Sequence, residues 1–155
     1  MYTNPLKSFL FNMPGNWICQ KTLYCIKNSE IRSHQIKINI NTLTNNSNNN
    51  EETIIQHYYQ YSILNKNIIY KYIQDKDQFN IKGILYRIYN NTKSEYKFEL
   101  HNGYLKLQSG KDDLKYTEYM YCVNSKFIIS IVVIKINQNY IAVGFNSNIK
   151  INKNN

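Results

Sequence analysis

The chain has 155 residues, of which 43% are hydrophobic, and its 19 Lys and Arg against 10 Asp and Glu give a net charge of +9. This length indicates one domain with a sizeable core, and the apolar share excludes wholesale disorder. The basic residues are spread along the chain with no Arg-rich run, which disfavours a nucleic-acid reader. An acidic ligand and an acidic protein partner explain the charge equally well.

Cysteine usage and apolar runs limit the compartment and the chemistry. The three cysteines form no CxxC pair and there are only three histidines, so no metal site is expected. An odd cysteine count without a signal-peptide pattern favours a reducing compartment. The longest apolar run, residues 127–136, is too short to span a bilayer. A soluble protein without a membrane partner is therefore expected.

The chain begins with a short helix and two strands. Residues 5–13 carry an apolar stripe at helical spacing, and Pro14-Gly15 then ends the helix. Residues 16–26 are rich in strand-forming residues, and residues 34–40 (HQIKINI) alternate isoleucine with polar side chains.

A low-complexity stretch, residues 45–50 (NNSNNN), predicts an exposed loop. The loop leads into residues 51–62, where apolar and tyrosine side chains repeat at helical spacing. Asn50 can cap a helix there, and two glutamates suit its first turn. The pattern predicts a second short helix.

From residue 67 onward the pattern is that of short strands separated by turn signals at regular intervals. About nine to ten strands with one or two short helices predict an all-β protein, namely a single closed antiparallel barrel that is lipocalin-like or fatty-acid-binding-protein-like. A barrel of this size can hold one small ligand. We expect one domain over residues 1–155, with 151–155 as a frayed tail.

Several motifs in the right order resemble those of the CpcS/CpeS-type chromophore lyases, which load bilins onto phycobiliproteins. Residues 15–22 (GNWICQKT) resemble that family's opening G-x-W-x-S-Q-R-T. Residues 54–63 resemble the helix after its second strand, residues 118–127 its E-R-I-W-F-A-N-P-N-L, and residues 144–151 its closing S-F-C-S-E-I-R. Together the motifs cover nearly the whole chain.

The resemblance implies a bilin, phycocyanobilin or phycoerythrobilin, as the bound substrate, with no intrinsic cofactor. A cysteine of the acceptor phycobiliprotein subunit would add to the bilin and form a thioether, while the lyase orients the two reactants. The A+T-rich composition fits the plastid stroma of a red-lineage alga. The sequence leaves open whether the chain forms a homodimer or a hetero-oligomer.

A bilin offers two propionates and four pyrrolic nitrogens on a flat apolar body, so its site needs cations, an acceptor and aromatic walls. The resemblance and this chemistry select the following residues: Lys21 and Lys150 for the propionates, Glu118 for the nitrogens, Tyr121 and Tyr119 for the wall, and Ser130 and Ser147 as hydrogen-bonding groups. The two lysines are equally compatible with solvated side chains. Glu118 also fits a surface charge paired with a cross-strand lysine.

Strand alternation places Lys21 on the same face as Trp17 and Cys19, and Trp17 fits a plug at the closed end of the barrel. Cys19 and Cys122 fit small buried hydrophobes better than covalent bilin anchors. The three histidines receive no role.

The chain departs from the family's pattern where cations are expected. The opening Arg is Lys21, and two strand arginines fall on Ile128 and Ser130. A lysine lacks the bidentate fork of arginine, so a degenerate lyase is one interpretation. A non-catalytic lipocalin-type carrier of a bilin, a fatty acid or another small apolar anion is the main alternative. A single-strand nucleic-acid binder with stacked tyrosines is a third.

Overall fold

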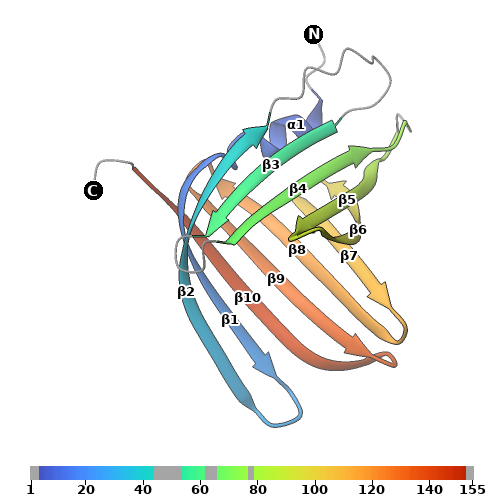
Figure 1. Cartoon of the computed structure of the whole chain (residues 1–155). Coiled ribbons are helices and arrows are strands. Elements are labelled where there is room, and N and C mark those ends of the chain that lie inside the picture. Colours follow the sequence, from blue (N-terminus) through green and yellow to red (C-terminus); the bar gives the residue numbers. More distant parts are fainter. Residues whose placement is uncertain (1–3, 44–53, 62–65, 77–78, 153–155) are drawn as a thin grey trace.

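The chain folds into a closed barrel of antiparallel strands with a short helix at one end (Figure 1). The computed structural model describes residues 4–43, 54–61, 66–76 and 79–152. These residues form one helix and ten strands: α1 Pro5–Leu10, β1 Gly15–Cys25, β2 Glu30–Leu43, β3 Ile54–Tyr61, β4 Lys66–Gln74, β5 Ile81–Tyr89, β6 Thr92–His101, β7 Tyr104–Lys111, β8 Leu114–Asn124, β9 Phe127–Ile136 and β10 Asn139–Ile151.

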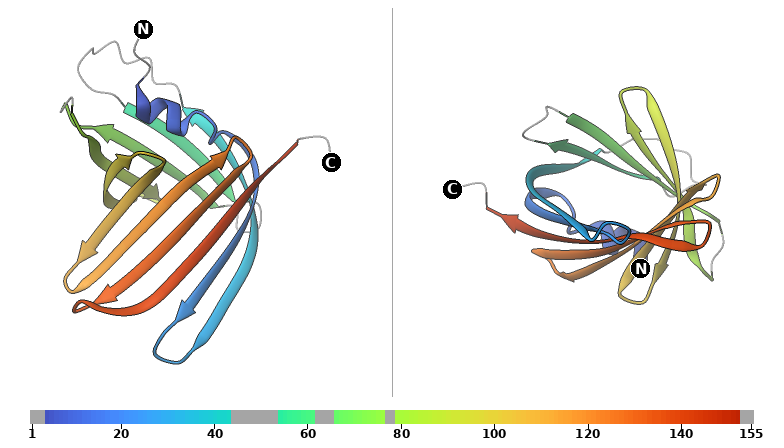
Figure 2. Two further views of the ribbon diagram at one scale, coloured as in Figure 1. Left: turned by 180° about the vertical axis from the view of Figure 1, so that it is seen from behind. Right: turned by 90° about the horizontal axis from the view of Figure 1, so that it is seen from below.

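Consecutive strands pair along the chain, and β1 pairs with both β2 and β10, so the sheet has no free edge. The predicted all-β, lipocalin-like barrel is thereby confirmed. The strands surround the barrel axis, and α1 lies at the end opposite the β1–β2 hairpin (Figures 1 and 2). Ile151 belongs to β10, so the expected frayed tail does not begin there, and residues 153–155 lie outside the described residues.

Helix α1 forms because its first turn is capped. The Asn4 side-chain oxygen accepts hydrogen bonds from the backbone amides of Leu6 (2.9 Å) and Lys7 (3.2 Å), and Pro5 occupies the first helical turn. Leu6 and Leu10 are fully buried and pack into the core cluster. The helix ends at Leu10, three residues before the expected boundary at residue 13.

The second expected helix, residues 51–62, is wrong, because residues 54–61 form strand β3. β3 pairs along its length with β2 and β4. Its side chains also fit a period of two, with Ile55, Tyr59 and Tyr61 packed against the core. β-Branched and aromatic residues suit a sheet, and the two neighbouring strands decide the ambiguous pattern. The expected loop at 45–50 and the expected cap at Asn50 lie outside the described residues.

The closed end of the barrel is packed around α1 and Trp17. Trp17 is 1% exposed, and its indole Nε1 donates to the Met13 carbonyl at 2.8 Å. Phe98, Leu105 and Ile128, from β6, β7 and β9, belong to the same core cluster. This packing confirms the expectation that Trp17 plugs the barrel, and it leaves the interior beyond Trp17 for a cavity.

Candidate functional site

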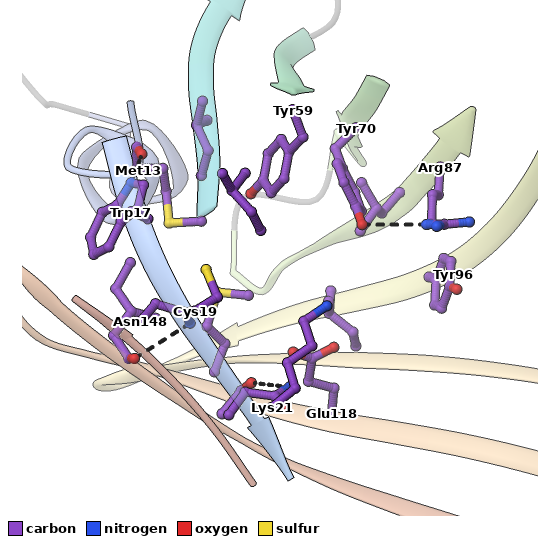
Figure 3. A pocket seen from close by; sticks show the side chains of 18 of the residues that line it. Met13, Trp17, Cys19, Lys21, Tyr59, Tyr70, Arg87, Tyr96, Glu118 and Asn148 are labelled. Carbon is purple, nitrogen blue, oxygen red and sulfur yellow. Dashed lines mark hydrogen bonds between the residues drawn. The ribbon is translucent and has the colours of Figure 1, made fainter. Parts of the chain in front are cut away.

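A cavity of about 340 Å³ lies inside the barrel above Trp17, a volume within the range of small-molecule sites (Figure 3). Trp17, Tyr72 and Leu85 line it and are almost fully buried. Lys21 and Arg87 also line it but keep part of their surface exposed. The cavity therefore has an apolar floor and charged groups nearer to solvent.

One wall of the cavity is aromatic. The rings of Tyr59 on β3 and Tyr70 on β4 lie 4.4 Å apart, and those of Tyr96 on β6 and Tyr116 on β8 meet edge to face at 6.0 Å. Burial raises the pKa of the Tyr59 and Tyr70 hydroxyls. These side chains therefore stay neutral phenols, which offer flat apolar surface together with hydrogen-bonding hydroxyls.

The part of the lining that comes from β1, β9 and β10 is polar. Asn146 Nδ2 donates to Ser130 Oγ at 3.2 Å, and Asn148 Nδ2 donates to the Ile128 carbonyl at 3.4 Å. All three polar side chains line the cavity beside Lys21. An elongated flat molecule would thus face tyrosines on one side and amides on the other.

Three charged side chains line the cavity: Lys21, Arg87 and Glu118. Glu118 accepts a hydrogen bond from the Tyr116 hydroxyl at 2.7 Å, and Arg87 Nε donates to the Tyr70 hydroxyl at 3.3 Å. The Lys21 ammonium lies 5.9 Å from the centre of the Tyr61 ring.

No ion pair of the described residues joins either cation to Glu118 or to another carboxylate. Figure 3 shows Lys21 and Arg87 rising from different walls of the cavity. Half-buried cations without a carboxylate partner are costly, so the site suits an anionic ligand.

Three of the residues selected from the sequence line the cavity, namely Lys21, Glu118 and Ser130. Lys21 stands where strand alternation from Trp17 predicts it, two residues beyond Cys19. Ser130 is 2% exposed and is already bonded to Asn146, so its hydroxyl shapes the polar wall.

Lys150 lies at the closed end and does not line the cavity. Its ammonium donates to the Asn12 carbonyl at 2.6 Å and lies 4.9 Å from the centre of the Trp17 ring. Burial lowers the pKa of this lysine. A Cβ at position 15 would approach the Lys150 side chain to 3.2 Å, and Gly15 has a φ of +137°, so glycine suits that position on both counts. Lys150 thus ties the segment after α1 to β10.

Tyr121, Tyr119 and Ser147 face the outside of the barrel. Glu118 and Met120 of β8 line the cavity, as do Asn146 and Asn148 of β10, so the residues between and beside them point outward. Tyr121 instead packs against Tyr104, with tilted rings whose centres lie 5.3 Å apart. The motif resemblance identified the strands but not which of their residues face inward.

Sequence reasoning missed Arg87, the tyrosines of β3 and β4, and the two asparagines of β10. Arg87 follows Gly83 and Leu85 on the inward face of β5, but apolar residues occupy the outward face of that strand as well. The alternation of β5 therefore does not mark either face as the inner one.

The cysteines are poorly suited to anchor a ligand. Cys19 lines the cavity at 3% exposure, and burial raises the pKa of its thiol to about 11, against a smaller opposing effect of Lys21. The pKa of Cys122 is also about 11 because of burial. Few thiolates form at neutral pH under these conditions. No cluster of His, Cys, Asp and Glu among the described residues has the geometry to hold a metal ion.

The fold is that of a lipocalin-like β-barrel whose interior holds a cavity of small-molecule size. No family model matches the chain. The "Chromophore lyase CpcS/CpeS homolog" of Gracilaria tenuistipitata var. liui is 34% identical over 148 residues, which are 94% of this chain and 97% of that protein. The chain belongs to the CpcS/CpeS family of chromophore lyases.

Two solved structures share the fold. The S-type phycobiliprotein lyase CPES from Guillardia theta superposes with a TM-score of 0.70 at 13% identity, over 96% of this chain and 93% of that one. A protein of unknown function from the DUF3598 family of Nostoc punctiforme gives a TM-score of 0.55 at 5% identity, over 92% of this chain and 49% of that one. Among the described helices, none is long and apolar enough to cross a membrane.

Proposed function

We propose that the chain binds an open-chain tetrapyrrole in the barrel cavity and promotes its thioether attachment to a cysteine of a phycobiliprotein subunit. The observation that carries this proposal is the pair Lys21 and Arg87, two cations in a tyrosine-walled cavity without a carboxylate partner among the described residues. A bilin supplies two propionates on a flat conjugated body, which matches both features. Membership of a chromophore lyase family supports the same conclusion.

In this reaction the acceptor thiol adds across the ethylidene double bond of the bilin A ring. The sulfur bonds to one carbon, the thiol proton is taken up by the other end of the conjugated system, and nothing is released. The nucleophile comes from the acceptor, in agreement with the raised pKa of the Cys19 thiol. The chain's contribution is to hold the bilin in one conformation and to expose one face of its A ring.

Each charged residue then has a separate task. Lys21 and Arg87 each bind one propionate. Arg87 provides a bidentate guanidinium, as the family's two strand arginines would at the positions where this chain has Ile128 and Ser130. Glu118, held by the Tyr116 hydroxyl, accepts hydrogen bonds from the pyrrolic nitrogens. Arg87 thus supplies, from another strand, one of the two arginines that the chain lacks at Ile128 and Ser130, which favours an active lyase over a degenerate one.

The first prediction concerns these cations. Adding phycocyanobilin or phycoerythrobilin to the purified protein should shift the bilin absorbance, and titration gives a dissociation constant. Arg87→Gln and Lys21→Ala should each weaken binding by about tenfold or more, because each removes a charge-assisted contact. Lys21→Arg should keep or improve the affinity, because it adds a second donor to the same propionate.

The chain offers matched controls, because Arg32 is its other arginine and is solvent-exposed, paired with Glu30. Arg32→Gln and Lys27→Ala, at an exposed turn residue, should leave bilin affinity unchanged. Equal affinity for Arg87→Gln and Arg32→Gln would refute the propionate assignment. Bilin binding without transfer to an apo-phycobiliprotein subunit would instead indicate the carrier function.

A further inference from the structure

The outer face of β8, β9 and β10 carries several exposed apolar side chains. The inward residues of these strands line the cavity, so Tyr119, Ile131 and Phe145 point outward. They form one cross-strand row, because Tyr119 pairs with Ile131 and Ile131 pairs with Phe145. Ile131 is 38% exposed and Phe145 49%.

A second row runs parallel to the first, from Tyr104 through Tyr121 to Ile129. The Tyr104 ring stacks on His101 with centres 4.8 Å apart and contacts Tyr121, which extends the row toward β6. We call these two rows the outer apolar face. Contiguous exposed apolar surface of this kind marks interaction sites on proteins.

The charges around the outer apolar face are mostly basic, and its acidic neighbour is Glu99 of β6, which lies opposite Lys106 and bonds His101. Across the four neighbouring strands β8, β9, β10 and β1, all of which are described in full, the only carboxylate is Glu118, and it points into the cavity. Lys106 lies beside Tyr119, and Lys115 pairs with Lys135 farther along the same side of the sheet. Asp112 and Asp113 are confined to the turn between β7 and β8.

This charge distribution favours an acidic partner over a second copy of this chain. A twofold dimer through this face would set the same patch against itself and bring its lysines near those of the second copy. A partner with an apolar centre and an acidic rim is complementary on both counts. The proposed reaction requires a second macromolecule, the acceptor subunit, and it must bind outside the barrel because the bilin fills the cavity.

We propose that the outer apolar face of β8–β10 is the docking surface for the acceptor phycobiliprotein subunit, with Lys106, Lys115 and Lys135 contacting acidic residues of that subunit. This inference rests on the proposed function. The bilin contacts the inner side of these strands and the acceptor their outer side, so the acceptor cysteine reaches the A ring over the open rim of the barrel and not through the sheet. Glu118 and Met120 face the bilin, while Tyr119 and Tyr121 face the acceptor.

Binding of the acceptor alone tests the surface without the chemistry. Apo-phycocyanin and apo-phycoerythrin subunits whose chromophore-binding cysteine is replaced by serine serve as probes, titrated into the lyase by calorimetry in the absence of bilin. The double variant Ile131→Ser/Phe145→Ser should bind the acceptor at least about tenfold more weakly, as truncations at the centre of an interface do. Ile31→Ser, at a 67%-exposed isoleucine on β2, is the matched control and should bind like the wild type.

Charge is tested on the same face. Lys106→Glu should weaken acceptor binding and reduce its dependence on NaCl concentration, while Lys106→Arg should preserve both. Bilin affinity, measured separately by absorbance, should be unchanged in all these variants because the face lies outside the cavity. A failure of the wild type to bind bilin would therefore count against the proposed function and not against the surface.

Two results would overturn the docking surface. One is an acceptor affinity that is the same in the wild type, in Ile31→Ser and in the double variant, or no acceptor binding by the wild type at all. The other is a wild-type dimer, seen by light scattering, that the double variant converts to a monomer while acceptor affinity stays unchanged. In that case the face binds a second copy of this chain.

Discussion

At the scale of single residues, His57 is a buried polar side chain with a ring nitrogen that no described residue satisfies. It is 1% exposed on β3, its ring meets Tyr72 edge to face at 6.2 Å, and its Nδ1 has no hydrogen-bond partner in the described part of the chain. Burial lowers its pKa from 6.5 to about 4. The folded barrel therefore holds a neutral imidazole that the unfolded chain protonates more readily.

The second prediction follows from this lowered pKa. Between pH 6.5 and pH 4 the unfolded state binds more protons at His57 than the folded state, so the free energy of unfolding falls as the pH falls. Above pH 6.5 His57 does not lower the free energy of unfolding. Below pH 6.5 it lowers that free energy by about 1.4 kcal/mol per pH unit, and the loss levels off below pH 4. His57 should therefore lower the stability by about 2 kcal/mol at pH 5 relative to pH 7.

Urea denaturation of the wild type and of His57→Leu at the two pH values measures this difference. The variant should lose about 2 kcal/mol less than the wild type on going from pH 7 to pH 5. His34→Leu, at an exposed histidine of β2, is the matched control for this substitution. The same pH dependence in His57→Leu and the wild type would contradict the assignment.

The sequence predicted most clearly the part of the site near Trp17, whose burial could be expected. Trp17 is the chain's one tryptophan, and its expected burial set the parity of β1 and so placed Lys21 in the cavity. Lys150 shares its inward face with Asn148, yet the carbonyl of Asn12 binds it. Asn12 lies 138 positions from Lys150 in the sequence, so no residue pattern within β10 could predict this hydrogen bond. Both faces of β5 carry apolar residues, so only the structure of the closed barrel shows that Arg87 faces inward.

At the scale of elements, turn chemistry was more informative than periodicity. Asn90-Asn91 and Asn137-Gln138 separate strands in the sequence, and all four residues have positive φ in the structure, which asparagine tolerates well. β3 was mistaken for a helix because IIQHYYQY fits periods of both 3.6 and two. Hydrogen bonds to β2 and β4 determine its structure, and they depend on residues distant in sequence.

The third prediction concerns the close approach of β4 and β5. A Cβ at position 83 would overlap the carbonyl oxygen of Ile73 and lie 2.9 Å from the Phe98 ring. Neither group can move without shifting a strand or the core, so Gly83→Ala should destabilise the protein by about 1–3 kcal/mol. Urea denaturation measures the loss.

Gly110→Ala is the control for this substitution. A Cβ there meets one atom, the Leu114 carbonyl oxygen at 3.3 Å, and the position is exposed. Its effect should stay within about 0.5 kcal/mol. If Gly83→Ala were as stable as Gly110→Ala, the close packing of β4 against β5 would be refuted.

At the scale of the whole molecule, the barrel divides its interior between stability and ligand binding. Around α1 and Trp17 the core is closely packed, whereas the cavity above it keeps two cations without a carboxylate partner among the described residues and several buried hydroxyls. Such a cavity and such charges make the folded state less stable than a fully packed apolar core would. An anionic ligand restores both, so occupancy of the cavity should be coupled to global stability.

The fourth prediction measures this coupling. A ligand that binds only the folded state stabilises it by about 2.7 kcal/mol at a hundredfold excess over its dissociation constant. For a chain of this length, that energy corresponds to a rise in Tm of roughly 5–10 °C. Phycocyanobilin or phycoerythrobilin at a concentration a hundredfold above the wild-type dissociation constant should therefore raise the Tm of the wild type and of Arg32→Gln, followed by circular dichroism. At that same concentration the Tm of Arg87→Gln should rise less, because its larger dissociation constant reduces the stabilisation by the ligand. A bilin that shifts its absorbance on mixing yet leaves the wild-type Tm unchanged would bind the folded and the unfolded chain equally well, which would refute binding in the folded cavity.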